Sequence, residues 1–300
     1  MLRKKLSACL LLALSGGVCH NMAAAGDVAS RNSSLPLAVA NGFDIRVPVQ
    51  ETVLFRGGMS LDAAGGPQSQ ILYPAVGGLG GFLVGIATHG VLVETGKERE
   101  KTRIQQEADK ILDPYRESIS KFTFRQLAER ALQKDALKGF GHLIGADDRG
   151  EGFVVKTEPV FTLTSDRRAL VLENVISVFR AGIPSDVLYS NVFRVVSDPR
   201  SEDDLESYWG KDNARQILAV SQEMFVRSLK IATSVVETSV ASNEMEKTIR
   251  YFEGGAKLIE RGQVMEQLCG RVLGRNLRGW VISVPTGKFS EEALCETAKL

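Results

Sequence analysis

Residues 73–94 read Tyr-Pro-Ala-Val-Gly-Gly-Leu-Gly-Gly-Phe-Leu-Val-Gly-Ile-Ala-Thr-His-Gly-Val-Leu-Val-Glu, and the rest of the chain is interpreted around this stretch. Gly77, Gly81 and Gly85 recur every four residues, so on a helix they would form one stripe of small residues. Such a stripe lets a second helix approach backbone to backbone. The stretch therefore predicts a glycine-rich apolar helix. A flexible loop is the alternative, because each interior glycine costs a helix up to about 1 kcal/mol.

The sequence permits two environments for this helix, a membrane or the interior of the folded protein. Residues 76–93 carry no charged side chain, and as a helix they would extend about 27 Å, which is marginal for a bilayer core. Nine of these residues are Val, Leu, Ile or Phe, so the segment is only weakly apolar for a membrane span. It either associates with a membrane or lies buried in the fold.

The first 25 residues have the anatomy of a secretory signal peptide. A basic start at residues 3–5 precedes an apolar run at 6–18, and Ala23-Ala24-Ala25 supplies a small-residue cleavage site. We therefore expect an exported protein, periplasmic or associated with the outer membrane. The alternative is a lipoprotein anchored through Cys19, although Gly16-Gly17-Val18 is a poor match to a lipidation signal.

The charge balance argues against nucleic acid as a partner. The chain has 37 Lys+Arg and 36 Asp+Glu, and removal of the three basic residues of the leader leaves 34 against 36, a net charge of −2. A general nucleic-acid binder would carry a basic excess. The 44% content of hydrophobic residues is typical of a packed globular protein.

Patterns along the mature chain predict an α+β fold, with antiparallel β-meanders packed against amphipathic helices in addition to the glycine-rich apolar helix. Residues 26–72 are expected to be a lead-in with short strands, residues 73–145 the glycine-zipper and charged helical region, and residues 146–300 an α+β domain. Pro114 interrupts the charged helix, and Asp113 is expected to cap the helix that follows.

Motifs for catalysis are weak. The mature chain has two histidines, His89 and His142, and no nucleophile elbow, phosphate loop or zinc-ligand spacing. We therefore assign no catalytic residue, no cofactor and no metal site, and an enzyme ranks last among the functions considered.

One arginine cluster is a candidate for binding an anion. Arg261, Arg271, Arg275 and Arg278 fall close together near Trp280, and on a strand Arg271 and Arg275 would share a face. Guanidinium groups beside an aromatic ring suit a phosphate or carboxylate. The alternative is that these arginines simply solvate one face of a sheet.

Cys269 and Cys295 are the two cysteines of the mature chain. In an exported protein such a pair permits one disulfide, which would close a loop of about 26 residues. Two buried thiols that never meet are the alternative.

The export signal, the glycine-rich residues 76–93 and the charged helix after them resemble exported bacterial proteins with a glycine-zipper segment. No site residue carries over from this resemblance. The sequence predicts a non-enzymatic envelope protein that acts through membrane association or self-assembly. The second hypothesis is a soluble periplasmic protein that binds a small anionic envelope ligand.

Overall fold

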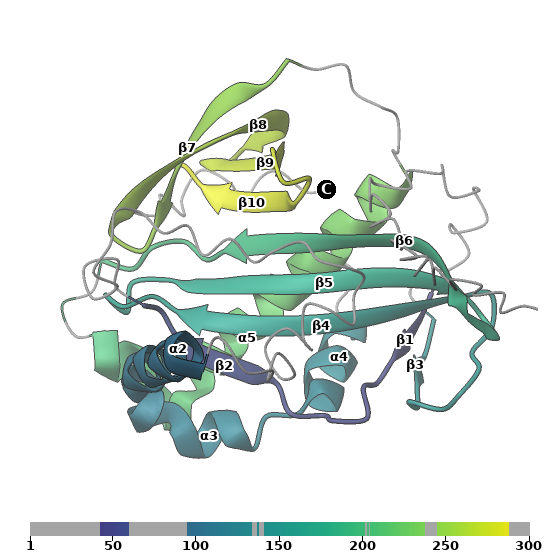
Figure 1. Cartoon of the computed structure of the whole chain (residues 1–300), viewed down its shortest axis with the longest axis horizontal. Coiled ribbons are helices and arrows are strands. Elements are labelled where there is room, and N and C mark those ends of the chain that lie inside the picture. Colours follow the sequence, from purple (N-terminus) through teal and green to yellow (C-terminus); the bar gives the residue numbers. More distant parts are fainter. Residues whose placement is uncertain are drawn as a thin grey trace, which may run out of the picture.

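Three long strands form the centre of the protein in this computed structural model, which describes residues 43–59, 95–133, 137, 141–201, 203, 205–237 and 245–287. They are β4 (Phe153–Leu163), β5 (Leu170–Arg180) and β6 (Ile183–Val196), and each pairs antiparallel with the next (Figure 1). The leader, Cys19 and the glycine stripe at Gly77, Gly81 and Gly85 lie outside the described residues, so the glycine-rich helix stays a prediction.

Among the described residues, the sheet continues on both sides of these strands to a total of ten. On one side lie β1 (Asp44–Arg46), β2 (Leu54–Gly57) and β3 (Leu143–Ile144); on the other lie β7 (Lys247–Glu253), β8 (Ala256–Leu268), β9 (Arg271–Asn276) and β10 (Val281–Pro285). The last four strands join the centre because β10 pairs parallel with β6, with Val281 opposite Phe193. The α+β class, with a large and mostly antiparallel sheet, is confirmed.

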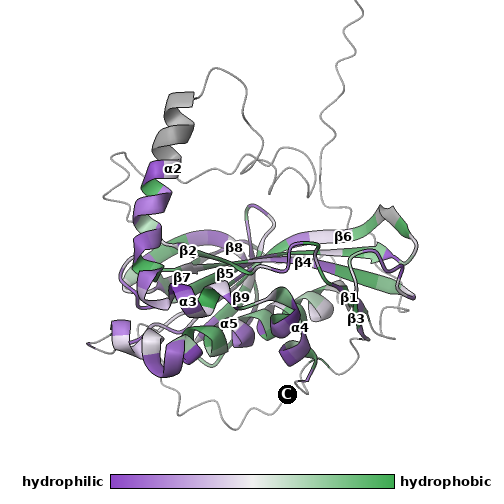
Figure 2. Ribbon diagram, turned by 90° about the horizontal axis from the view of Figure 1, so that it is seen from below, coloured by the Kyte–Doolittle hydropathy of each residue, from purple (hydrophilic) through white to green (hydrophobic). Residues whose placement is uncertain are grey.

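Helices cover one face of this sheet. They are the 3-10 helix η2 (Lys110–Tyr115), α3 (Arg116–Ser120), α4 (Phe124–Leu132) and α5 (Leu205–Glu237), whereas α2 (Thr95–Asp109) packs against β2 at the edge of the sheet. Figure 2 shows α3, α4 and α5 gathered on the same side of the strands. The helix α5 is interrupted at residues 211–214, where three residues have positive φ.

The expected cap at Asp113 is wrong. Asp113 and Pro114 both lie inside η2, and the residue that precedes α3 is Tyr115, which makes no side-chain capping bond. The Asp113 carboxylate instead accepts a hydrogen bond of 2.5 Å from the Arg116 guanidinium. Pro114 is tolerated because a short 3-10 turn carries the chain from one α-helix to the next.

The main core fills the space between the helices and the sheet. Leu127 of α4, Phe225 of α5 and Phe161 of β4 are each 0% exposed. Full burial of such a side chain typically contributes about 1.5–3 kcal/mol. The rings of Phe124 and Phe225 meet edge to face with centroids 6.0 Å apart, which fixes α4 against α5.

A second, smaller core lies on the opposite face, where β7–β10 fold back over β5 and β6. Its members are Ala169, Val171, Val196, Ile249, Tyr251, Val272, Ile282 and Val284. Close packing here requires Gly274, because a Cβ at this position would lie 2.7 Å from the carbonyl oxygen of Gln263. This fold-back carries the hairpin β7–β8 over Arg194 of β6.

Candidate functional site

The hairpin β7–β8 is the most informative part of the structure for function, because its two faces carry side chains of opposite charge. Ile249 and Tyr251 are 2% and 1% exposed and therefore point into the second core. Because side chains alternate along a strand, Glu253 shares this inner face, and Arg250 points outward. Across the hairpin, Glu260 lies opposite Ile249 and is therefore also on the inner face.

On the inner face, carboxylates surround one arginine. A guanidinium nitrogen of Arg194 lies 2.6 Å from Glu253, and others lie 3.7 Å from Glu173 and 3.8 Å from Glu260. The side chain of Arg194 is 17% exposed, and those of the three glutamates are 23–27% exposed. Strands β5, β6, β7 and β8 thus each contribute one charged group, so this cluster forms only when the hairpin folds back over the sheet.

Hydrogen bonds orient the carboxylate of Glu260. The hydroxyl of Tyr251 donates to Oε1 at 2.8 Å, and the side-chain amide of Asn276 donates to Oε2 at 3.1 Å. Burial raises the pKa of Tyr251 above its usual value, so its hydroxyl stays protonated and continues to donate. Both oxygens of Glu260 are therefore satisfied from the inner face.

Burial also raises the pKa of the Glu253 carboxyl. Arg194 opposes this shift, whereas the negative charges of Glu173, Glu260 and Asp166 add to it. For Arg194 burial acts to lower the pKa, but the charges of Glu253 and its neighbours outweigh that effect and raise it. Arg194 therefore stays positively charged, and Glu253 is the carboxyl in this cluster that binds a proton more readily than usual.

The outer face of the hairpin is basic and apolar. The cross-strand pairs are Phe252 with Lys257, Arg250 with Ile259 and Thr248 with Arg261. Ile259 is 63% exposed, and the side chain of Arg261 is 65% exposed. We call these six residues the outer face of the hairpin.

The structure divides the four arginines singled out from the sequence. Arg261 lies on the outer face of the hairpin, and Arg278 lies in the turn between β9 and β10, with its guanidinium carbon 5.4 Å from the ring centroid of Trp280. Arg271 and Arg275 share a face of β9. All four therefore belong to the C-terminal strands, but they do not converge on one point.

The guanidinium group of Arg271 has a structural role, because its hydrogen bonds hold β9 in place. Its guanidinium donates to the Asp198 carboxylate at 2.5 Å and to the carbonyl oxygens of Val196 and Ser283 at 2.6 Å and 3.0 Å. Burial and the neighbouring positive charge of Arg227 lower the pKa of Arg271 to about 10, and Asp198 opposes this shift. Arg271 thus links the end of β6 to β10.

Sequence reasoning missed Arg250, Lys257 and the partners of Arg194. Arg250 and Lys257 had a usable signal: the hairpin turn at Gly254-Gly255, combined with strand alternation, puts both on the face of Arg261. The Arg194 cluster had no such signal, because Arg194 and Glu253 are 59 positions apart. Cys269 begins the turn after β8, and Cys295 lies outside the described residues, so their disulfide stays a prediction.

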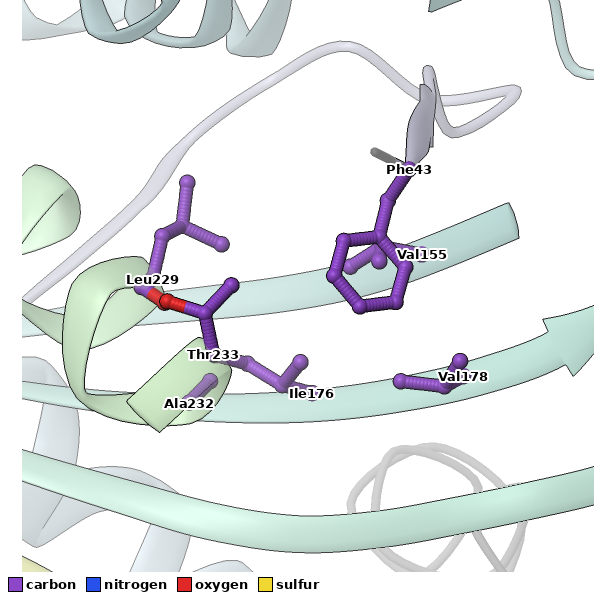
Figure 3. A pocket seen from close by; sticks show the side chains of 7 residues that line it. All are labelled: Phe43, Val155, Ile176, Val178, Leu229, Ala232 and Thr233. Carbon is purple, nitrogen blue, oxygen red and sulfur yellow. The ribbon is translucent and has the colours of Figure 1, made fainter. Parts of the chain in front are cut away.

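A small apolar cavity lies under α5 (Figure 3). Phe43, Val155, Ile176 and Val178 line it from the sheet side, and Leu229, Ala232 and Thr233 line it from α5. Its volume is about 10 Å³, enough for about one water molecule at most. This cavity is a packing defect of the main core and too small for a ligand.

Within the part of the chain that the structure describes, no helix is long and apolar enough to cross a membrane. No group of three or more His, Cys, Asp or Glu side chains among the same residues is arranged to hold a metal ion. No family model, curated protein or solved structure matches this chain.

Proposed function

We propose that this protein is a non-enzymatic, exported protein of the cell envelope that acts by associating with the membrane or with copies of itself. The observation that carries the proposal is the outer face of the hairpin, where Arg250, Lys257 and Arg261 accompany an isoleucine that is 63% exposed. An exposed aliphatic side chain among long cationic ones is typical of a surface that meets another surface. The leader at residues 1–25 supplies the export signal.

The glycine-rich stretch is the second element of this proposal. Residues 73–94 form an apolar helix that packs closely through Gly77, Gly81 and Gly85. Replacing Gly81 and Gly85 together with leucine should block that approach, because a bulky side chain would stand where a backbone belongs. We expect the double variant to fold and to lose membrane association or oligomers; a loss of thermal stability alone would instead indicate a helix buried within the fold.

The direct test is fractionation of the full chain after expression with its leader in a bacterial host that has a periplasm. We expect the mature protein in the membrane pellet, with partial release by a salt or carbonate wash. Recovery of all of the protein in the soluble periplasmic fraction would contradict the proposal. Recovery of the full-length protein, with its leader uncleaved, in the cytoplasm would contradict the proposed export.

A second candidate function is binding of a small anionic envelope ligand, and the proximity of Arg227 to Arg271 favours it. The positive charges of Arg227 and Arg271 repel each other, and Asp198 is the carboxylate that pairs with Arg271. A bound phosphate or carboxylate would relieve that repulsion. Calorimetric titration with inorganic phosphate tests it: saturable binding that is lost in Arg227→Gln supports this candidate, and equal heats for both proteins exclude it.

A further inference from the structure

We propose that the outer face of the hairpin binds the surface of an anionic phospholipid bilayer. This inference rests on the proposed envelope function and names the partner of the surface described above. The outer face would lie flat on the bilayer, with Arg250, Lys257 and Arg261 against lipid phosphates and Ile259 at the boundary between headgroups and acyl chains.

Strand alternation separates the charges of residues 250–261 of the hairpin. The carboxylates of Glu253 and Glu260 point inward to Arg194, whereas Arg250, Lys257 and Arg261 point outward. A chain with a net charge of only +1 thus has a locally basic surface near the turn of the hairpin. An anionic surface complements this part of the hairpin, whereas the exposed carboxylate of Glu266 lies farther along β8, beyond the register shift at Met265.

Two of the outward cations have no competing partner in the described residues. Arg250 and Lys257 are exposed, and their side chains make no hydrogen bond or ion pair with any of the described residues. Arg261 has one loose ion pair, at 3.6 Å, to Glu246 just before β7. Because loose surface pairs contribute little, Arg261 can exchange that carboxylate for a phosphate at low cost.

The apolar part of the surface extends beyond the hairpin. The backbone N–H of Leu277 donates to the carbonyl oxygen of Arg261 at 3.2 Å, which puts the two residues side by side. Leu277 is 64% exposed, and Arg278, which follows it, is also exposed. A long cationic side chain such as that of Arg278 favours the membrane interface, where it meets phosphate, whereas Trp280 packs against the second core.

The combination of residues favours a bilayer over a soluble polyanion. A soluble polyanion would use the cations alone and would leave Ile259 and Leu277 in water, whereas a bilayer accommodates both kinds of side chain. Each cation near an anionic leaflet should strengthen binding about fivefold, so three should account for about a hundredfold. The aliphatic side chains should add a part of the affinity that salt does not remove.

The test is co-sedimentation of the full mature chain with vesicles of phosphatidylcholine that contain increasing phosphatidylglycerol. We expect binding that rises steeply with the anionic lipid, and about a hundredfold weaker binding for the triple variant R250Q/K257Q/R261Q. The matched control is R130Q/R215Q/K230Q, which removes the same charge from exposed positions on α4 and α5. The control should bind like the wild type.

A second variant tests the apolar contribution. The double change Ile259→Thr and Leu277→Gln keeps every charge, and we expect it to weaken binding severalfold and to leave more of the remaining binding sensitive to salt. Thermal unfolding of each variant checks that the fold is intact.

Three outcomes would overturn the inference. Equal binding to neutral and anionic vesicles would show that charge does not drive binding. An equal loss of vesicle binding in the control triple variant would show that the outer face is not the binding surface. Binding that follows charge alone, with no effect of the double variant, would make a soluble polyanion the partner instead. Failure of the envelope function gives a different result: the protein would then bind vesicles through this face but stay in the soluble fraction of cells.

Discussion

The Asp166 carboxylate accepts a hydrogen bond of 2.6 Å from the backbone N–H of Gly255, a residue 89 positions later in the chain. The same carboxylate accepts bonds from the hydroxyl of Thr164 and the backbone N–H of Arg168. It therefore ties the turn between β4 and β5 to the turn of the hairpin β7–β8. Gly254 is required at this junction, because it has a φ of +61° and a Cβ there would lie 2.5 Å from Oδ1 of Asp166.

Replacing Asp166 with alanine should destabilise the protein by about 2–3 kcal/mol, because a charged acceptor with three donors is lost. Urea unfolding measures this change. Asp147→Ala is the control, since Asp147 is exposed in a loop, and it should stay within about 0.5 kcal/mol of the wild type. A similar loss of unfolding free energy in both variants would show that the hydrogen bonds of Asp166 between the two turns do not stabilise the protein.

The same residue should make the protein sensitive to acid. Burial acts to raise the pKa of Asp166, but the hydrogen bonds from Thr164, Arg168 and Gly255 outweigh it and lower the pKa below 3.8. A carboxyl with a lowered pKa stabilises the folded protein at a pH above its pKa in the unfolded chain. That stability is lost as the pH falls through its pKa in the folded protein. The difference between wild type and Asp166→Ala should therefore shrink when unfolding is measured at about pH 2 instead of about pH 6.

Glu253 should change the pH dependence of stability in the opposite direction to Asp166. The pKa of Glu253 is raised, mainly by burial. Its contribution to stability is therefore fully present at a pH below its pKa in the unfolded chain and is lost as the pH rises through its pKa in the folded protein. Glu253→Gln cannot ionise, so its stability should fall less than that of the wild type between about pH 5 and about pH 8. The exposed residue Glu266 provides the control, and Glu266→Gln should follow the wild-type profile. Parallel profiles for wild type and Glu253→Gln would contradict this assignment.

The position of α2 depends on one close approach. Gly57 of β2 donates its N–H to the Asp109 carboxylate at 2.8 Å, and a Cβ at this position would overlap the carbonyl oxygen of Ala108. We expect Gly57→Ala to cost about 1–3 kcal/mol, because α2 must move away from the strand. Gly210→Ala is the matched control: its Cβ would lie 3.6 Å from the ring of Tyr115, an ordinary contact, and it should be neutral or gain up to about 1 kcal/mol. Thermal unfolding of both variants decides the point.

The predicted disulfide can be tested by mass spectrometry of the exported protein without reduction. Pairing of Cys269 with Cys295 removes two hydrogens and should leave neither cysteine available for alkylation. It should also protect the end of the chain from proteolysis, because the bond would hold the terminus to the turn after β8. Alkylation of both cysteines in native exported protein would contradict the pairing.

Local patterns in the sequence predicted the elements better than their arrangement. The alternation of apolar and polar residues is typical of β4 and β7, whereas β5 is buried on both faces and has a nearly continuous apolar sequence. Residues 257–268 lie in one strand, β8, with a register shift at Met265 between Val264 and Glu266. A bulge of this kind interrupts the alternation without ending the strand, so the sequence pattern resembles two strands.

The amino-acid sequence by itself determined which side chains share a face: alternation alone places Arg250 with Lys257 and Arg261 once the turn at Gly254-Gly255 sets the register. Only the tertiary structure decided what each face meets. The parallel pairing of β10 with β6 brings Glu253 onto Arg194, and the end of β6 brings Asp198 to Arg271. The physical reason is that periodicity depends on a residue and its near neighbours, whereas strand pairing depends on backbone groups that any distant strand can offer.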